Sequence, residues 1–296
     1  MHNLQEEIYA MNDFVIITDS ACDISAEILA SRGIRAQSLT FRFTDEDKEY
    51  KNEDLSAKDF YDRMRNGAVA KTSAINIEGF KEIFREELIA GRDVLYLGFS
   101  SGLSNTYNAG RLAAEELLDE FPDRRVIAID TLCASAGQGL LVMLAADKKD
   151  EGAGIEDVAR YVMDIRLKLC HWFTVDDLKY LKRGGRVSPT AAFVGGVLNI
   201  KPVMHVDDEG HLINVSKVRG RKTALRTIAD KYAELALDKN GTVYISHGDC
   251  PEDVAEIKAL LEEKGADVQI ITDVGPVIGS HSGPGTLAVF FLGSKR

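Results

Sequence analysis

Hydroxyl side chains gather in the segment Phe99–Tyr107, which reads FSSGLSNTY. An apolar run precedes this segment, and a stretch rich in Ala, Leu and Glu follows it. If a strand ends here and a helix begins, the free N–H groups and the dipole of the helix N-terminus favour an anion. A pocket for a carboxylate or phosphate fits this arrangement, and so does simple capping of the helix by Ser101 or Ser104. The segment has neither the P-loop spacing GxxxxGK[ST] nor the GxSxG of a nucleophile elbow.

A second candidate for chemistry is His281, which lies between two serines in the segment Gly275–Gly285, GPVIGSHSGPG. The four glycines and two prolines of this segment predict a shaped, rigid loop. Glycine is placed where the backbone must approach another group closely. The pattern therefore favours a fixed histidine directed at an anionic ligand over an incidental surface histidine.

Charged residues form three further candidates. Two basic clusters, Leu181–Arg186 (LKRGGR) and Lys217–Lys222 (KVRGRK), could bind a phosphate or a protein partner, or be ordinary solvated charge. Asp19 and Asp23 follow the first strand and could bind a metal or act as acid and base. No cluster with convincing ligand spacing joins them, so we expect them to order the loop, and we predict no metal site.

The elements that must position these residues alternate between strands and helices in the first half of the chain. Such alternation predicts βαβ units and a parallel sheet, with the ligand outside the carboxyl ends of the strands. Small hydroxyl residues follow the strands there, including Ser20, Thr72, Ser73 and Thr131. The expected strands are Phe14–Thr18, Ala36–Phe43, Asp93–Phe99 and Arg125–Asp130, and the expected helices are Ser25–Arg32, Leu55–Asn66, Gly79–Ala90, Ser104–Glu120, Ser135–Lys149 and Ile155–Lys168.

The pattern changes after about residue 168. Lys201–Val206 and Leu212–Val218 flank the turn signal Asp-Asp-Glu-Gly at 207–210, which predicts a hairpin. Strands and helices alternate again after the hairpin. We therefore predict an α/β protein of two domains. Residues 1–168 would form a parallel-sheet α/β domain, and residues 169–296 an α+β domain with a mixed, partly antiparallel sheet.

Composition excludes several classes of function. The 296 residues carry 36 Lys and Arg against 47 Asp and Glu, a formal charge of −11, which argues against nucleic-acid or anionic-membrane binding. The four cysteines have no short spacing, so free thiols in a reducing cytoplasm are expected. Residues 1–14 lack the features of a signal peptide. The longest apolar runs have the length of strands, so we expect a cytoplasmic protein without membrane insertion.

Several motifs in a fixed order resemble the DegV family of bacterial fatty-acid-binding proteins. They include TDSACDIS at Thr18–Ser25, KTSAIN at Lys71–Asn76 and VDDLKYLKRGGRVS at Val175–Ser188, together with the two segments around Ser104 and His281. No single motif is decisive, but their order and spacing are specific, and the resemblance extends from Phe14 to the end of the chain.

The resemblance implies two α/β domains with a lipid in the crevice between them. It implies that the chain binds a long-chain fatty acid and presents its carboxylate to a separate ATP-dependent fatty acid kinase, whose acyl phosphate product feeds phospholipid synthesis. Thr72, Ser100 or Ser101, and His281 would hold the carboxylate. Arg186 and Arg219 would face the kinase or its transferred phosphate. The chain itself would be a carrier with no catalytic residue, metal or cofactor, and the fatty acid would be its ligand.

An enzyme is the alternative. A serine hydrolase or acyltransferase could use Ser100 or Ser101 with His281, but it would need a carboxylate to orient the histidine. No Asp or Glu lies within seven residues of His281 in the sequence. A dinucleotide-binding redox protein would need GxGxxG after the first strand, and that motif is absent. The carrier is therefore the favoured interpretation.

Overall fold

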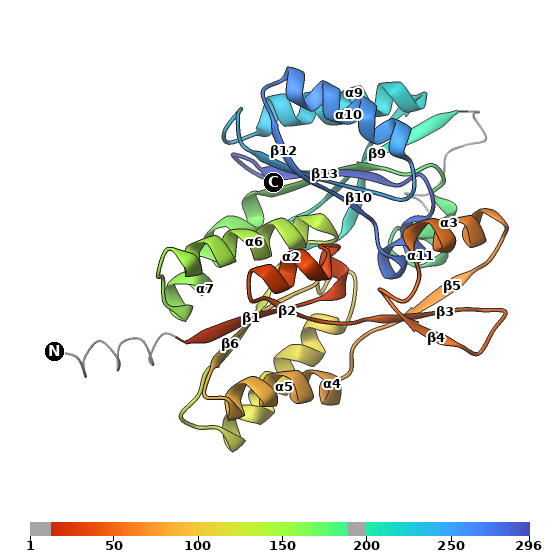
Figure 1. The fold of residues 1–296 in the computed structure, drawn as a ribbon. Coiled ribbons are helices and arrows are strands. Elements are labelled where there is room, and N and C mark those ends of the chain that lie inside the picture. The colour runs from red at the N-terminus through yellow and green to blue at the C-terminus, as the bar shows by residue number, and fades with distance from the viewer. Residues whose placement is uncertain (1–12, 189–198) are drawn as a thin grey trace.

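A computed structural model describes residues 13–188 and 199–296 (Figure 1). We expected no signal peptide in residues 1–14, and residues 1–12 of that segment lie outside the described residues. The described strands form a four-stranded, a six-stranded and a three-stranded sheet. The fold class expected from the sequence is confirmed, with a parallel sheet in the first half of the chain and a mixed sheet in the second.

The four-stranded sheet is entirely parallel, in the order β2-β1-β6-β7. Every residue of β1 is buried, and alternate side chains enter different cores because neighbours on a strand point to opposite faces. Helices α4 and α5 cover one face, and α6 and α7 cover the other (Figure 1). The bounds are β1 Phe14–Asp19, β2 Arg35–Gln37, β6 Asp93–Gly98, β7 Val126–Asp130, α2 Ala26–Ser31, α4 Ile77–Ile89, α5 Thr106–Glu120, α6 Ala136–Asp150 and α7 Ile155–Ile165, with one-turn 3-10 helices at Ser20–Cys22 and Arg166–Lys168.

The expected single strand Ala36–Phe43 is wrong, because two strands of different sheets occupy it. After β2 the chain turns at Ser38 and Leu39, where the backbone N–H of Leu39 donates to Ser20 Oγ. The next strand, β3, then starts the small antiparallel sheet β4-β3-β5, which the sequence analysis did not predict. Helix α3 packs aromatic side chains on this sheet, as in the edge-to-face contact of Phe60 with Phe41. The bounds are β3 Thr40–Phe43, β4 Glu49–Lys51, β5 Ala70–Ser73 and α3 Ala57–Arg65.

The six-stranded sheet contains the predicted hairpin as β9 and β10, at its edge. Only β11 and β12 pair in parallel, and the other neighbours are antiparallel. Helices α9 and α10 cover one face, whereas α6 lies against the other (Figure 1). The bounds are β8 Leu169–Thr174, β9 Ile200–Val206, β10 Leu212–Arg219, β11 Thr242–His247, β12 Asp267–Asp273, β13 Leu287–Leu292, α8 Lys179–Arg183, α9 Arg221–Leu235 and α10 Pro251–Glu263.

The glycine-rich segment around His281 contains a helix, α11 (Pro276–Ser282), where we expected a loop. Pro276 starts it at the first helical position, and Gly283 ends it with a left-handed φ of 82°. Gly279 lets the helix approach α3, because a Cβ there would lie 2.5 Å from Tyr61 Oη. Tertiary contact therefore makes a helix from a segment whose composition is typical of a loop.

The two halves of the chain share a core. Helix α6 lies between the parallel sheet and the six-stranded sheet, and one buried cluster contains Phe14 and Leu97 together with Phe173 and Phe290. Helix α11 of the second half packs on α3, β3 and β5 of the first. The division into residues 1–168 and 169–296 therefore stays a prediction.

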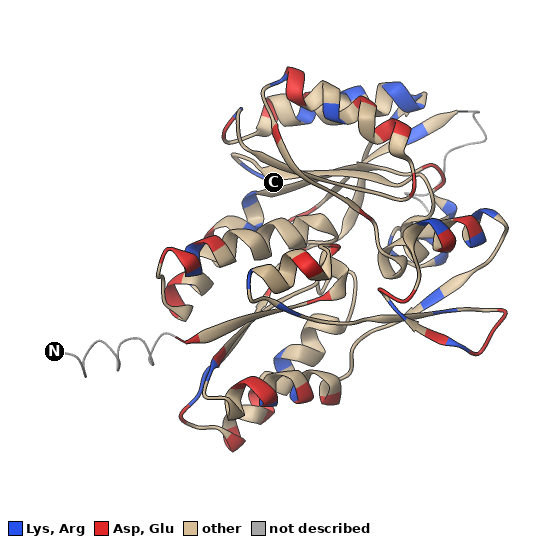
Figure 2. Cartoon of the chain, in the orientation of Figure 1, with Lys and Arg blue, Asp and Glu red and all other residues tan. Residues whose placement is uncertain are grey.

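Charges of both signs are interspersed on the helices and loops of the molecule, while the strands are mostly uncharged (Figure 2). Within residues 13–188 and 199–296, no helix combines the length and the apolar character needed to cross a membrane.

Candidate functional site

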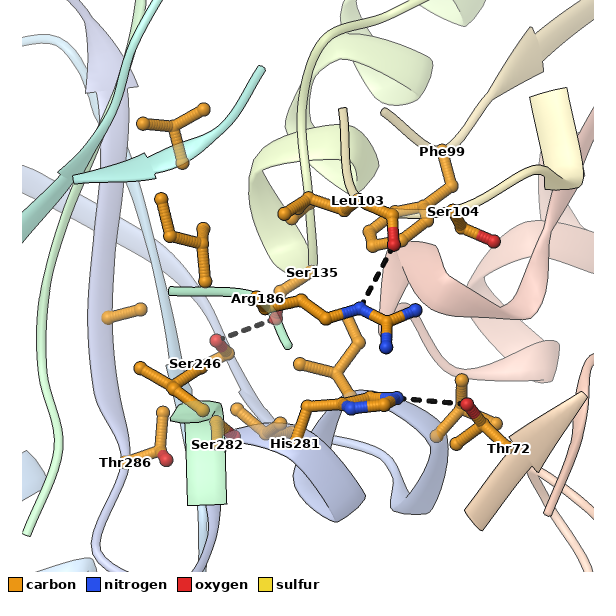
Figure 3. A pocket seen from close by; sticks show the side chains of 18 of the residues that line it. Thr72, Phe99, Leu103, Ser104, Ser135, Arg186, Ser246, His281, Ser282 and Thr286 are labelled. Atoms are coloured by element: carbon orange, nitrogen blue, oxygen red, sulfur yellow. Dashed lines mark hydrogen bonds between the residues drawn. The ribbon is translucent and has the colours of Figure 1, made fainter. Parts of the chain in front are cut away.

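A cavity of about 310 Å³ lies where β5, α11 and the chain after β6 meet the six-stranded sheet (Figure 3). Its volume is within the range of small-molecule pockets, about 300–1,000 Å³. Most of its wall is apolar and comes from both halves of the chain, including Leu39, Phe99, Leu103, Phe173, Val277 and Phe290. A ligand with a long apolar part would therefore lose much of its contact with water here.

One end of the cavity carries the polar residues Thr72, Ser104, Arg186 and His281. Thr72 lies on β5 opposite Phe41, and Ser104 immediately precedes α5. His281 is in the last turn of α11. All four are partly exposed, so this end is the mouth of the cavity.

His281 is neutral at physiological pH. Burial, followed by the positive charges of Arg186 and Arg183, lowers its pKa from 6.5 to about 4. Its Nε2 shares a hydrogen bond of 2.9 Å with Thr72 Oγ1, and its Nδ1 has no partner among the described residues (Figure 3). A Cβ on Gly184 would lie 2.2 Å from Nδ1, so the imidazole position requires glycine at 184.

Arg186 supplies the positive charge of the mouth. Its Nε donates to the backbone oxygen of Leu103 at 3.1 Å, and the guanidinium also donates to the backbone oxygen of Gly184. Within the described parts of the chain, no acidic side chain forms an ion pair with it, and burial lowers its pKa. A half-buried guanidinium without a counter-ion, beside two hydroxyls and a neutral imidazole, is complementary to a carboxylate.

The structure brings together only some of the residues expected to form the site. Thr72 and His281 are in contact, but Ser100 and Ser101 do not line the cavity. Ser100 is buried elsewhere, and its Oγ donates to the backbone oxygen of Gly210 at 2.9 Å, which ties the strand end to the β9–β10 hairpin. Ser101 is exposed, and its N–H donates to Asp130 Oδ1.

Ser104 is the serine of this segment that lies at the cavity, where we expected Ser100 or Ser101. It lines the cavity, and its Oγ lies 2.9 Å from Thr106 Oγ1 and accepts from the Thr106 N–H. The sequence analysis considered Ser104 only as a helix cap. The signal that could have found it is its position directly before the helix, where a side chain both caps and faces the anion-binding end.

The two arginines expected to face a kinase lie apart. Arg186 lines the cavity itself, whereas Arg219 is exposed at the end of β10 and does not line it. Asp19 and Asp23 order the loops around them, as expected. Asp19 accepts from the N–H of Phe99 at 2.9 Å, and Asp23 accepts from the N–H of Gly275 at 3.0 Å.

The arrangement that a serine hydrolase needs is not assembled around His281. Its Nε2 contacts Thr72 rather than a serine, and in the described residues no carboxylate reaches its Nδ1. Ser100 Oγ is engaged with Gly210 on the hairpin.

Comparison with known proteins places this geometry in a family. Residues 13–294 match the model described as "Uncharacterised protein, DegV family". A DegV domain-containing protein of Clostridium perfringens is 42% identical over 291 residues, which are 97% of this chain and 99% of that protein.

Solved structures agree with this match. A Thermus thermophilus structure described as fatty acid binding of a DegV family protein has a TM-score of 0.84 and 31% identity, and the alignment covers 94% of this chain and 98% of that one. A stearic acid-binding protein from Eubacterium ventriosum has a TM-score of 0.84 and 26% identity over 94% of this chain and 97% of that one. The chain belongs to the DegV family.

Proposed function

We propose that this protein binds a long-chain fatty acid in the cavity, with the carboxylate at the mouth and the acyl chain inside. The observation that carries this proposal is the guanidinium of Arg186, which lacks an acidic partner among the described residues and lies at the polar end of an apolar cavity. The relatives described as binding fatty acids support the same ligand class.

The carboxylate would take its contacts from the four residues of the mouth. Arg186 would supply the charge, and the hydroxyls of Thr72 and Ser104 would donate hydrogen bonds. His281, neutral in the empty protein, would orient Thr72 through their shared hydrogen bond. A ligand without a carboxylate would leave the guanidinium unpaired.

The apolar wall would provide most of the affinity. Burial of about a dozen methylenes at about 0.8 kcal/mol each gives roughly 10 kcal/mol before losses. Immobilising the acyl chain and the ligand as a whole opposes this by several kcal/mol. The polar residues would therefore fix the direction of the ligand more than its total affinity.

We further propose that the bound carboxylate is presented to a separate ATP-dependent fatty acid kinase, which makes the acyl phosphate used in phospholipid synthesis. The support is the exposure of the mouth, where Ser73, Ala74 and Asn105 are exposed while the far end is buried. The carboxylate would thus be the accessible part of the ligand. Under this proposal the chain is a cytoplasmic carrier, and the kinase carries the catalysis.

Binding is tested by native mass spectrometry of the protein purified from cells, followed by extraction and identification of the lipid. One fatty acid per chain is the expected result. A protein that purifies empty and takes up neither stearic nor oleic acid would contradict the proposal.

Presentation is tested with the loaded protein, ATP and a kinase of such a system. Arg219→Ala should leave lipid affinity unchanged and slow acyl phosphate formation, because Arg219 is exposed and lies outside the cavity wall. Arg226→Ala on α9 removes the same charge from an exposed position and is the matched control. Equal rates for wild type and Arg219→Ala would count against this use of Arg219.

A further inference from the structure

The buried end of the cavity is polar, although an unmodified acyl chain ends in a methyl group. Ser135, Ser246, Ser282 and Thr286 all line the cavity there and are between 0% and 6% exposed. Figure 3 shows Ser246, Ser282 and Thr286 on one side of His281 and Thr72 on the other. The cavity therefore has two sets of polar residues. The four mouth residues form one set, and these four buried hydroxyl residues form the other, the inner group.

Ser282 is the least satisfied member of the inner group. It is 5% exposed, and its Oγ has no hydrogen-bond partner among the described residues. Its proton and its lone pairs are therefore not used by any described residue. A buried hydroxyl without a partner is unfavourable, and most such groups in proteins find one.

Ser246 is a buried polar position on the face of the six-stranded sheet that borders the cavity. It lies on β11 opposite Ala288 of β13, which in turn lies opposite Phe173 of β8. Its Oγ is 2.9 Å from Ser135 Oγ, and Ser135 Oγ donates to the buried carboxylate of Asp23. Since the proton of Ser135 is used on Asp23, Ser246 donates to Ser135, and its own lone pairs stay free for a ligand.

Thr286 adds a second acceptor. Its Oγ1 donates to the backbone oxygen of Gly283 at 2.7 Å, which leaves lone pairs on the hydroxyl oxygen. The inner group thus offers one donor from Ser282 and several acceptors. A neutral hydroxyl, which donates one hydrogen bond and accepts others, complements this set. A second carboxylate would only accept, so it would leave the lone pairs of Ser246 and Thr286 without a donor.

We propose that the cavity recognises a fatty acid that carries a hydroxyl group on its acyl chain, held by Ser246 and Ser282. This inference rests on the proposed function, because the carboxylate at the mouth sets the direction of the chain. It goes beyond fatty acid binding by assigning a chemical subclass of ligand to the inner hydroxyl group.

The test is a comparison of stearic acid with its positional hydroxy derivatives, from 3-hydroxystearic to 12-hydroxystearic acid, by equilibrium titration. We expect at least one isomer to bind about threefold to tenfold more tightly than stearic acid, the effect of one net hydrogen bond. Ser282→Ala should abolish this preference and leave the affinity for stearic acid unchanged or higher, because the unpaired hydroxyl is gone.

Ser280→Ala is the matched control, since Ser280 is buried in the same helix but donates to the backbone oxygen of Pro276 and does not line the cavity. It should keep the preference. The inference is overturned if stearic acid binds and every hydroxy isomer binds equally or more weakly, as would happen with water satisfying Ser282. If neither stearic acid nor any isomer binds, the proposed function fails together with the inference.

Discussion

At the scale of single residues, the protonation state of His281 determines which group carries the charge at the mouth. Burial and the nearby Arg186 and Arg183 hold the pKa of His281 at about 4, so the imidazole is neutral and Arg186 alone is positive among the four mouth residues. A carboxylate would therefore form its ion pair with Arg186, and the imidazole would act through its hydrogen bond with Thr72.

The depressed pKa of His281 has a measurable consequence for stability. In the unfolded chain the histidine has a pKa of about 6.5, so between pH 4 and 6.5 the unfolded state binds more protons than the folded state. The free energy of unfolding of wild type relative to His281→Gln should stay constant above pH 6.5 and fall as the pH drops toward 4. Urea unfolding of both proteins across this range measures the difference, and a constant difference throughout would contradict a neutral, buried His281.

Substitutions of Ser104 and of Ser100 should differ in their effects on fatty acid binding and on the free energy of unfolding. Ser104→Ala should weaken fatty acid binding about threefold to tenfold, because it removes one hydrogen bond to the ligand, and should lower the free energy of unfolding by about 1 kcal/mol, because the Thr106 N–H loses its acceptor. Ser100→Ala should lower the free energy of unfolding by about 1–3 kcal/mol, since it leaves the buried backbone oxygen of Gly210 without its partner. Calorimetric titration and urea unfolding of both variants check this, and a reversed pattern would return the ligand role to Ser100.

At the scale of elements, the chain after α8 fixes the position of the α11 histidine. Gly184 has an ordinary negative φ of −74°, and its missing Cβ makes room for His281 Nδ1. Gly185 has a φ of 71° and open space around it. One glycine is therefore needed for contact and its neighbour for backbone conformation.

This pair of glycines provides a matched experiment. Gly184→Ala should displace the imidazole and reduce fatty acid affinity about tenfold or more, since a Cβ at 2.2 Å cannot be accommodated in place. Gly185→Ala should lower the free energy of unfolding by about 1 kcal/mol through backbone strain and spare affinity. Fatty acid titration and urea unfolding of both variants measure these effects. Unchanged affinity in Gly184→Ala would show that fatty acid binding does not require this position of the histidine.

The elements also show what sequence patterns could and could not predict. Strands β1, β6 and β7 of the parallel sheet were predictable because their apolar runs are bounded by turn residues, whereas the three residues of β2 include no buried one. Strand β4 was not, because only Tyr50 of its three residues is buried. Helix α11 was missed because the glycines and prolines of its segment are typical of loops. In the structure Pro276 and Gly283 mark the two ends of the helix, and Gly279 permits the close approach to Tyr61.

The sequence allowed the residue types at the cavity mouth to be predicted better than the individual residues. Hydroxyls and one histidine were expected, and Thr72 and His281 are indeed in contact. Which serine of the segment Phe99–Tyr107 faces the cavity depends on the turn between β6 and α5, which composition does not determine. The direction of Arg186 depends on the backbone oxygen of Leu103, far away in the sequence.

At the scale of the whole molecule, the cavity wall and one core cluster draw on both halves of the chain. Tyr61 of α3 donates to the backbone oxygen of Val274 at 2.8 Å in a buried hydrogen bond, and Asp23 accepts from the N–H of Gly275, so hydrogen bonds also join the two halves. We expect them to unfold together.

A ligand in this cavity should stabilise both halves at once. Stearic acid at about 100 times its dissociation constant should raise the free energy of unfolding by about 2.7 kcal/mol. The fluorescence of Trp172, the only tryptophan, reports on the six-stranded sheet, while circular dichroism reports on the entire chain. The two signals should show one shared transition, shifted equally by the ligand. A shift confined to Trp172 fluorescence would contradict a cavity built from both halves.

The central claim is that the mouth captures a carboxylate through Arg186. Equilibrium binding of stearic acid and of its methyl ester to wild type and to Arg186→Met tests this most directly, because the ester keeps the acyl chain and removes the charge. We predict that wild type binds the acid about tenfold to a hundredfold more tightly than the ester, the range of a charge-assisted hydrogen bond, and that Arg186→Met loses this preference. Equal affinity of wild type for acid and ester would contradict the account.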